Sequence, residues 1–166
     1  MASIREQIMT AVEEHVTTYS RPAGVPLPVR TRVESPGASQ LPVISFYQVF
    51  ETPAAMHPGG SGRSSRGPVV RRTLDVRFEV LVKAVAGAST APDADADPFL
   101  IWIADAMSAI GRVVTASYPR GICSEEEPDE VGLIFEYERA SYSFVRAGLT
   151  FRFYYQTKRG DVEALT

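Results

Sequence analysis

The chain has 166 residues, of which 45% are hydrophobic, 22% charged and 10% aromatic. A chain of this length can form one domain with a substantial core, and this hydrophobic content excludes disorder throughout. It contains no apolar run of about 18 residues, so we expect no membrane-spanning helix. The single cysteine, Cys123, cannot form an internal disulfide, which agrees with a reducing compartment.

The formal net charge of −3 is unevenly distributed along the chain. Residues 21–83 carry nine basic and four acidic side chains, a net of +5. Residues 84–140 carry three basic and eleven acidic side chains, a net of −8. The acidic balance argues against binding nucleic acid through total charge. Such separated charge can pair within the domain, or it can present a positive face to one copy and a negative face to the next.

The first predicted element is an amphipathic helix. Ser3 and Glu6 have the spacing of a capping box, in which the serine oxygen accepts from a backbone amide and the glutamate reaches back to the cap. Apolar residues then recur every three or four positions. The helix must end by Ser20, because the connector 21–28 that follows it contains three prolines and one glycine.

Strands are predicted where apolar and polar residues alternate or where β-branched residues gather. The clearest runs from Leu74 to Val82, where nearly every second residue is apolar, as in a half-buried antiparallel strand. The other predicted strands are Val29 to Val33, Leu41 to Phe50, Val131 to Arg139 and Tyr142 to Thr157.

A second helix is predicted from Asp97 to Ile110, with the Asp97 carboxylate at its cap and Pro98 in its first turn. Strands grouped in runs predict an α+β fold: a largely antiparallel mixed sheet of about five strands with two main helices packed on one face. We expect residues 1–166 to form a single domain with a flexible Pro/Gly/Ser-rich loop at 51–68.

No pattern in the sequence indicates catalysis. His15 and His57 have no cysteine or carboxylate at metal-ligand spacing. The acidic series 93–97 lacks the glycine and glutamate of a calcium loop, and the glycine-rich stretch 59–67 leads into a strand rather than a helix. We therefore predict that the protein is not an enzyme and has no catalytic residues, cofactor or metal site.

The order of elements as a whole resembles a known family. The resemblance is carried by the opening helix Ser3-Ile4-Arg5-Glu6-Gln7-Ile8, the strands at 29–33, 41–44 and 74–84, the helix at 97–110, and the closing run Leu149-Thr150-Phe151-Arg152-Phe153-Tyr154-Tyr155-Gln156-Thr157 followed by Lys158-Arg159-Gly160-Asp161. In this order the chain resembles the tail terminators (minor tail proteins) of long-tailed bacteriophages.

The resemblance implies a structural virion protein that is assembled in the host cytoplasm and located in the tail near the neck. Such proteins form a homo-hexameric ring that caps the tail tube, ends its polymerisation and joins the tail to the neck. The implied partners are the tail-tube protein, a neck or head-completion protein and, in a contractile tail, the sheath. DNA passing through the ring would make only weak, non-specific contact, and no membrane is involved.

Charged residues in two segments are the candidate interface of such a ring, and we expect them to meet across subunits or between stacked rings. They are Arg63, Arg66, Arg71, Arg72, Glu125, Glu126, Glu127, Asp129 and Glu130. Two alternatives remain open at this stage. One is a neck or head-completion (connector) protein, and the other is a small hydrolase or nucleotide-binding domain.

Overall fold

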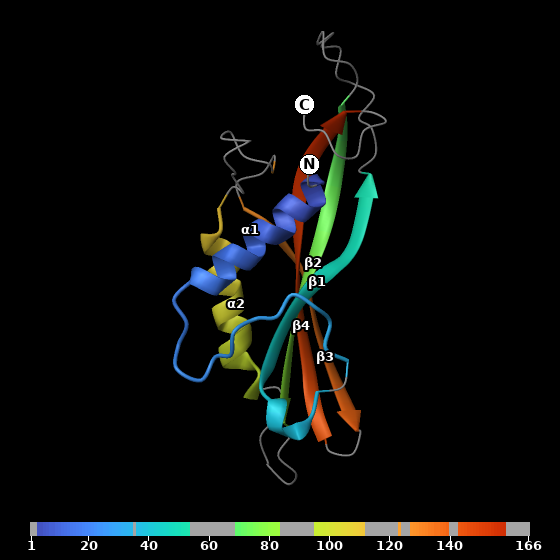
Figure 1. Ribbon diagram of the computed structural model, residues 1–166. Helices are drawn as coiled ribbons and strands as arrows, with labels where there is room; N and C mark the ends of the chain where they lie inside the picture. The colour runs from blue at the N-terminus through green and yellow to red at the C-terminus, as the bar shows by residue number, and fades with distance from the viewer. Residues whose placement is uncertain are drawn as a thin grey trace.

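The computed structural model describes residues 3–34, 36–53, 69–83, 95–111, 123, 127–139 and 143–158. These residues form an α+β fold with one four-stranded antiparallel sheet in the order β1-β2-β4-β3 (Figure 1). The elements are α1 (Ile4–Thr18), η1 (Ala38–Gln40), β1 (Val43–Pro53), β2 (Val69–Lys83), α2 (Asp97–Ala109), β3 (Asp129–Arg139) and β4 (Ser143–Lys158).

The predicted α+β class is confirmed, but the expected strand at 29–33 is wrong. In the described part of the chain this segment makes a single bridge, in which Val29 lies parallel to Ser45 of β1. The Val29 amide donates to the Ile44 carbonyl, and the Phe46 amide donates to the Val29 carbonyl, both at 2.9 Å. The Thr31 amide then donates back to the Val29 carbonyl at 2.9 Å rather than to β1, so the backbone turns at this point and the ladder does not continue beyond the bridge.

The first three residues of the predicted loop at 51–68 are part of a strand instead. Residues 51–53 belong to β1, and residues 54–68 lie outside the described part. Strand β2 also begins at Val69, earlier than the predicted Leu74, and pairs along its whole length with β4. Apolar and polar residues do not alternate clearly at the start of β2, so the sequence pattern did not indicate these residues as part of the strand. Their pairing with the long neighbouring strand β4 determines where β2 begins.

Helix α1 begins at the predicted cap. The Ser3 hydroxyl accepts a hydrogen bond from the Glu6 amide at 3.2 Å. The reciprocal half of the capping box is wrong, because the Glu6 carboxylate accepts from Arg30 at 2.7 Å instead. This hydrogen bond from Arg30 lowers the pKa of Glu6. It also ties the connector, which in the structure extends from α1 to residue 34, to the exposed side of α1.

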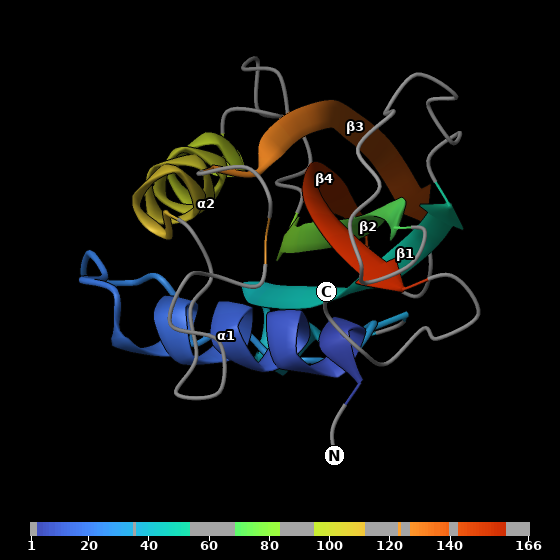
Figure 2. The same ribbon diagram turned by 90° about the horizontal axis from the view of Figure 1, so that it is seen from above.

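Both helices pack on one face of the sheet, as predicted (Figure 2). Alternate residues of β2 and β4 point toward them, and the fully buried aromatic rings of Phe46 and Phe78 stack with centroids 5.4 Å apart. Phe151 meets Phe78 edge-on at 6.0 Å. Aromatic contacts of this kind add to the free energy gained by burying the rings, so these strands provide the centre of the core.

Polar contacts link the two helices at the side of the core. The indole Nε1–H of Trp102 donates to the Ser20 carbonyl at 2.8 Å, and His15 Nε2 lies 2.7 Å from the Ala106 carbonyl. The predicted cap of α2 is wrong by one residue. Its cap is Ala96, which has no capping side chain, and Asp97 is the first helical residue. There the carboxylate still interacts favourably with the amino end of the helix dipole.

We expect Phe78→Ala to lower the free energy of unfolding by about 3–5 kcal/mol, because it leaves a cavity between two other aromatic rings. Urea unfolding followed by circular dichroism measures the change. The control is Ile101→Ala on α2, since Ile101 is 62% exposed and its truncation leaves no cavity. Equal losses in the two variants would contradict the assignment of Phe78 to the core.

Candidate interaction surfaces

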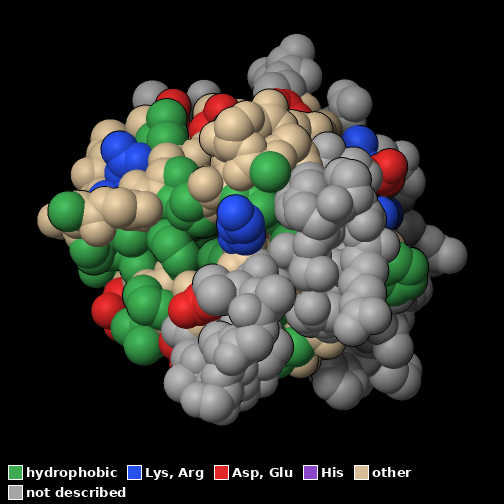
Figure 3. Space-filling view, turned by 90° about the horizontal axis from the view of Figure 1, so that it is seen from below, with side chains coloured by type: hydrophobic (Ala, Val, Ile, Leu, Met, Phe, Trp, Pro, Cys, Tyr) green, Lys and Arg blue, Asp and Glu red, His purple; other side chains and the backbone are tan. Residues whose placement is uncertain are grey.

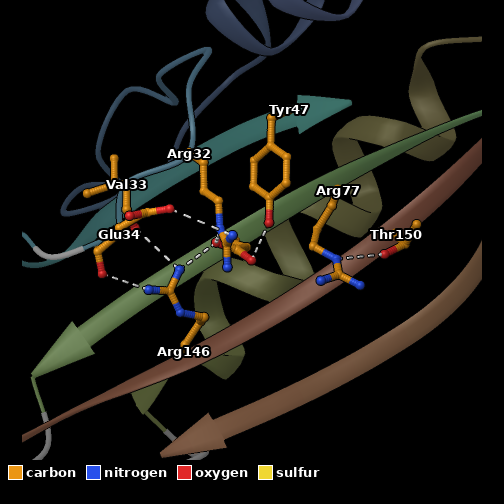
Figure 4. A network of polar contacts seen from close by, with 8 residues as sticks. Arg32, Val33, Glu34, Tyr47, Arg77, Arg146 and Thr150 are labelled. Atoms are coloured by element: carbon orange, nitrogen blue, oxygen red, sulfur yellow. Dashed lines mark hydrogen bonds and ion pairs between the residues drawn. The ribbon is translucent and has the colours of Figure 1, made fainter. Parts of the chain in front are cut away.

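The face of the sheet opposite the helices is polar. It is formed by the residues of β2 and β4 that alternate with the core, including Asp75, Arg77 and Glu79 on β2 and Arg146 and Arg152 on β4. Asp75, Glu79 and Arg146 are buried despite their charge. Charges buried in this way require partners, and the partners come from three strands and the connector (Figure 4).

Glu79 is the centre of this network and is 2% exposed. Its carboxylate accepts from Arg146 Nη1 at 2.6 Å and from the Tyr47 hydroxyl. Arg146 also donates to the Glu34 carbonyl at 2.9 Å. Burial of Tyr47 and its hydrogen bond to Glu79 raise the pKa of the Tyr47 hydroxyl. The network therefore fastens the end of the connector to the centre of the sheet.

A second ion pair lies further along the same face. Arg152 donates through Nε and Nη2 to the two carboxylate oxygens of Asp75, at 2.7 and 2.8 Å. This two-point hydrogen bond raises the pKa of Arg152. Arg77 lies between the two pairs and donates to the Thr150 hydroxyl at 3.3 Å. Cations and anions thus alternate across the strands, which stabilises their register.

A shallow hollow lies beside this network, where Gly148 leaves the sheet without a side chain. It has room for no more than about one water molecule, and it is lined by Arg77, Glu79, Ile134, Glu136, Arg146 and Gly148. A hollow of this size does not hold a substrate. Among its charged lining residues, Glu79 and Arg146 pair with each other, and Arg77 donates to the Thr150 hydroxyl.

The described residues contain no group of three or more His, Cys, Asp or Glu side chains placed to hold a metal ion. His15 contacts α2, as given above, while His57 lies outside the described part. Neither of the two helices in the described ranges is long and apolar enough to cross a bilayer.

The structure separates the two predicted basic residues of β2. Arg71 is on the polar face, with its guanidinium 5.1 Å from the centre of the Tyr154 ring. Arg72 is on the opposite face, where it donates to the Thr157 hydroxyl at 3.0 Å and pairs with Glu51 at 3.6 Å. Arg72 is therefore tied into the fold of its own chain.

Among the predicted acidic residues, Glu127, Asp129 and Glu130 are exposed. The Tyr154 hydroxyl donates to Asp129 at 2.8 Å, which raises the pKa of Tyr154. Tyr154 thus contacts both Asp129 and Arg71, so one predicted acidic residue and one predicted basic residue lie near each other within one chain. The remaining predicted residues, Arg63, Arg66, Glu125 and Glu126, lie outside the described part.

The edge strand β3 exposes hydrophobic side chains that the sequence analysis did not single out. Val131, Leu133, Ile134 and Phe135 are each at least 40% exposed. Neighbouring residues of a strand point to opposite faces, so both faces of this edge are apolar. A sequence signal existed, because the consecutive apolar residues 133–135 break the alternation expected of a strand with one solvent-facing side.

A second apolar region lies at the lower end of the molecule. Seen from below, hydrophobic side chains gather on the left of the view, the side of the helices in Figure 1 (Figure 3). Separately from this view, Leu27 and Val29 in the segment between α1 and β1 are 48% and 39% exposed. Exposed apolar area of this kind is typical of surfaces that contact other molecules.

Comparison with known proteins gives no relative from which a function can be transferred. No protein-family model matches the sequence, and no curated protein is similar to it. A functional assignment therefore depends on the surfaces described above.

We expect Glu79→Gln to lower the free energy of unfolding by about 3–5 kcal/mol, because it removes the negative charge that accepts from the buried Arg146 at 2.6 Å. Chemical denaturation measures the loss. The matched control is Glu34→Gln, which removes a surface ion pair with Arg32 at 3.9 Å from a side chain that is 79% exposed. The control should change stability by less than about 1 kcal/mol. A similarly small effect of Glu79→Gln would show that the buried pair is not required.

The raised pKa of Tyr47 predicts a loss of stability at alkaline pH. A tyrosine in the unfolded chain titrates near pH 10, whereas the folded chain holds this proton to higher pH. The stabilisation is therefore complete below about pH 10 and is lost as the pH rises through the raised pKa. In Tyr47→Phe, the free energy of unfolding should fall less steeply above pH 10, as measured by urea titrations across that range. Parallel pH profiles of the two chains would contradict this.

Proposed function

We propose that the chain is a structural assembly protein that forms a homo-hexameric ring, as a tail terminator of a long-tailed bacteriophage does. In this proposal the ring caps the tail tube, ends its polymerisation and joins the tail to the neck. Its partners are other copies of the chain, the tail-tube protein and a neck or head-completion protein. In a contractile tail, the sheath is a further partner.

The observation that carries the proposal is the exposed apolar edge of β3. Leu133 and Phe135 are 50% and 40% exposed on the helix side of the strand, and Ile134 is 40% exposed on the polar side. In proteins that remain monomeric, the edge strands of a sheet are usually short or charged, or are covered by another segment. A long edge strand with apolar side chains on both faces instead favours association with another protein chain.

The chemistry of the polar face supports a structural function over an enzymatic one. Glu79 and Asp75 are engaged by Arg146 and Arg152, and the hollow beside them has room for about one water molecule. A hydrolase or a nucleotide-binding domain would instead need a concave pocket with converging polar groups. The described residues provide ion pairs that hold the sheet together.

The mass of the purified full-length chain tests the proposal. We expect light scattering after size exclusion to give six times the mass of one chain, and negative-stain images to show closed rings. A ring closes when head-to-tail contacts repeat by rotation, so a single species rather than a range of sizes is expected.

Mixing the ring with purified tail tubes then tests where it acts. A terminator should sit at one end of each tube and stop further growth, whereas a connector protein should leave the tube ends free. A monomer in solution whose melting temperature rises with a small molecule would overturn the structural function and favour the enzyme alternative.

A further inference from the structure

Strand β3 has an open outer edge. Within the described ranges it pairs with β4 alone, and the ladder is irregular only near its start, between Glu130 and Gly132. From Gly132 to Arg139 the strand is regular. Its outward backbone groups are therefore lined up to pair with another strand, with Leu133 and Ile134 exposed on its two faces.

Charge disfavours some pairings of this edge with itself. The strand carries Asp129, Glu130, Glu136 and Glu138 against one basic residue, Arg139. An antiparallel self-pairing centred on Leu133 would place Glu130 opposite Glu136, and one centred on Ile134 would place Glu130 opposite Glu138. Like charges directly opposite each other destabilise a strand pair. A self-pairing centred on Phe135 opposes no like charges, so the test must distinguish a symmetric β3–β3 contact.

The other edge of the sheet, β1, also exposes apolar side chains. On the outer side of β1, within the described part, the bridge from Val29 covers the strand at Ser45. Beyond this bridge, Val49 and Phe50 are 43% and 59% exposed.

Two half-exposed arginines lie beside this edge, and both pair with carboxylates of the same chain. Arg5 pairs with Glu51 of β1 at 3.2 Å, and its side chain remains 50% exposed. Arg32 lies over the Tyr47 ring, with 5.8 Å from its guanidinium carbon to the ring centroid. It pairs with Glu34 at 3.9 Å and with Glu79 at 4.0 Å, and its side chain is 52% exposed. An apolar edge with arginine–carboxylate pairs beside it thus lies at one side of the sheet, and an apolar edge flanked by carboxylates lies at the other.

Strand direction permits the two edges to join. Each strand of the sheet is antiparallel to its neighbour, and four strands lie in the order β1-β2-β4-β3. The two edge strands therefore run in opposite directions, as Figure 1 shows. Two copies in the same orientation, placed side by side, bring β3 of one antiparallel to β1 of the next.

We propose that the β3 edge of one copy docks antiparallel onto the outer edge of β1 of the next copy, beyond Val29, and that this contact is the repeating interface between subunits. The inference rests on the proposed ring and adds to it the two surfaces that meet. The contact is heterologous, so each copy uses both of its edges, and rotation closes the series. Apolar side chains at 49–50 and 133–135 form its centre, with arginines and carboxylates around them.

Cysteine cross-linking of the full-length chain tests which edges meet. The double variant Val49→Cys/Leu133→Cys is treated with a short bismaleimide and analysed on a denaturing gel. Each single variant is treated in the same way. The unsubstituted chain controls for the native Cys123, which is buried. We expect the double variant to give a ladder of covalent products beyond the dimer, while the single variants remain monomeric on the gel.

The outcomes separate this inference from the proposed function. A hexamer in solution that gives no ladder of cross-linked products on the gel would overturn the edge contact but not the proposed hexameric ring. A ladder from an assembly that is not a hexamer would support the edge contact and overturn the hexameric ring. A covalent dimer from Leu133→Cys alone would show that β3 pairs with itself. A monomer in solution that gives no cross-links would overturn both proposals.

Discussion

The pairing of β2 with β4 is the interaction on which the rest of the structure depends. The two strands are hydrogen-bonded along the whole of β2, and each carries apolar and polar residues in alternation. One register therefore places Phe78 and Phe151 toward the helices and places Glu79 and Arg146 on the opposite face. A shift by one residue would turn the charged side chains toward the helices and the aromatic rings toward the opposite face, so the core and the ion pairs favour the same register. The outer strands β1 and β3 are then positioned by this central pair.

Much of the fold follows from local patterns in the sequence. The Ser3 cap, the two amphipathic helices and the alternation of β2 predicted the α+β class and the approximate place of each main element. The details that failed depended on contacts distant in sequence. Glu6 does not complete its capping box because Arg30 binds it, and Val29 makes a single bridge to Ser45 where a strand was expected. Neither contact has a periodic signature that local reasoning can detect.

The candidate surfaces were less predictable than the fold. Charge along the chain singled out Arg71 and Arg72, but alternation sends them to opposite faces, and Arg72 is held by Glu51 and Thr157. The apolar edge of β3 was missed because its residues resemble ordinary strand residues until the sheet order is known. Only the order β1-β2-β4-β3 places this strand at an edge, and a chain position gives no information about sheet order. The buried position of Glu79 likewise requires knowledge of the arginine side chains that surround it.

The hydrogen bond from the Trp102 indole to the Ser20 carbonyl provides the chain with an intrinsic optical reporter. Trp102 is the sole tryptophan of the sequence and is 4% exposed, so its emission comes from one apolar environment between α2 and the end of α1. Separation of the helices from each other would move the indole into water and shift its fluorescence to longer wavelength. Because Trp102 is on a helix rather than on an edge strand, the folded state of edge-strand variants can be followed without an added label.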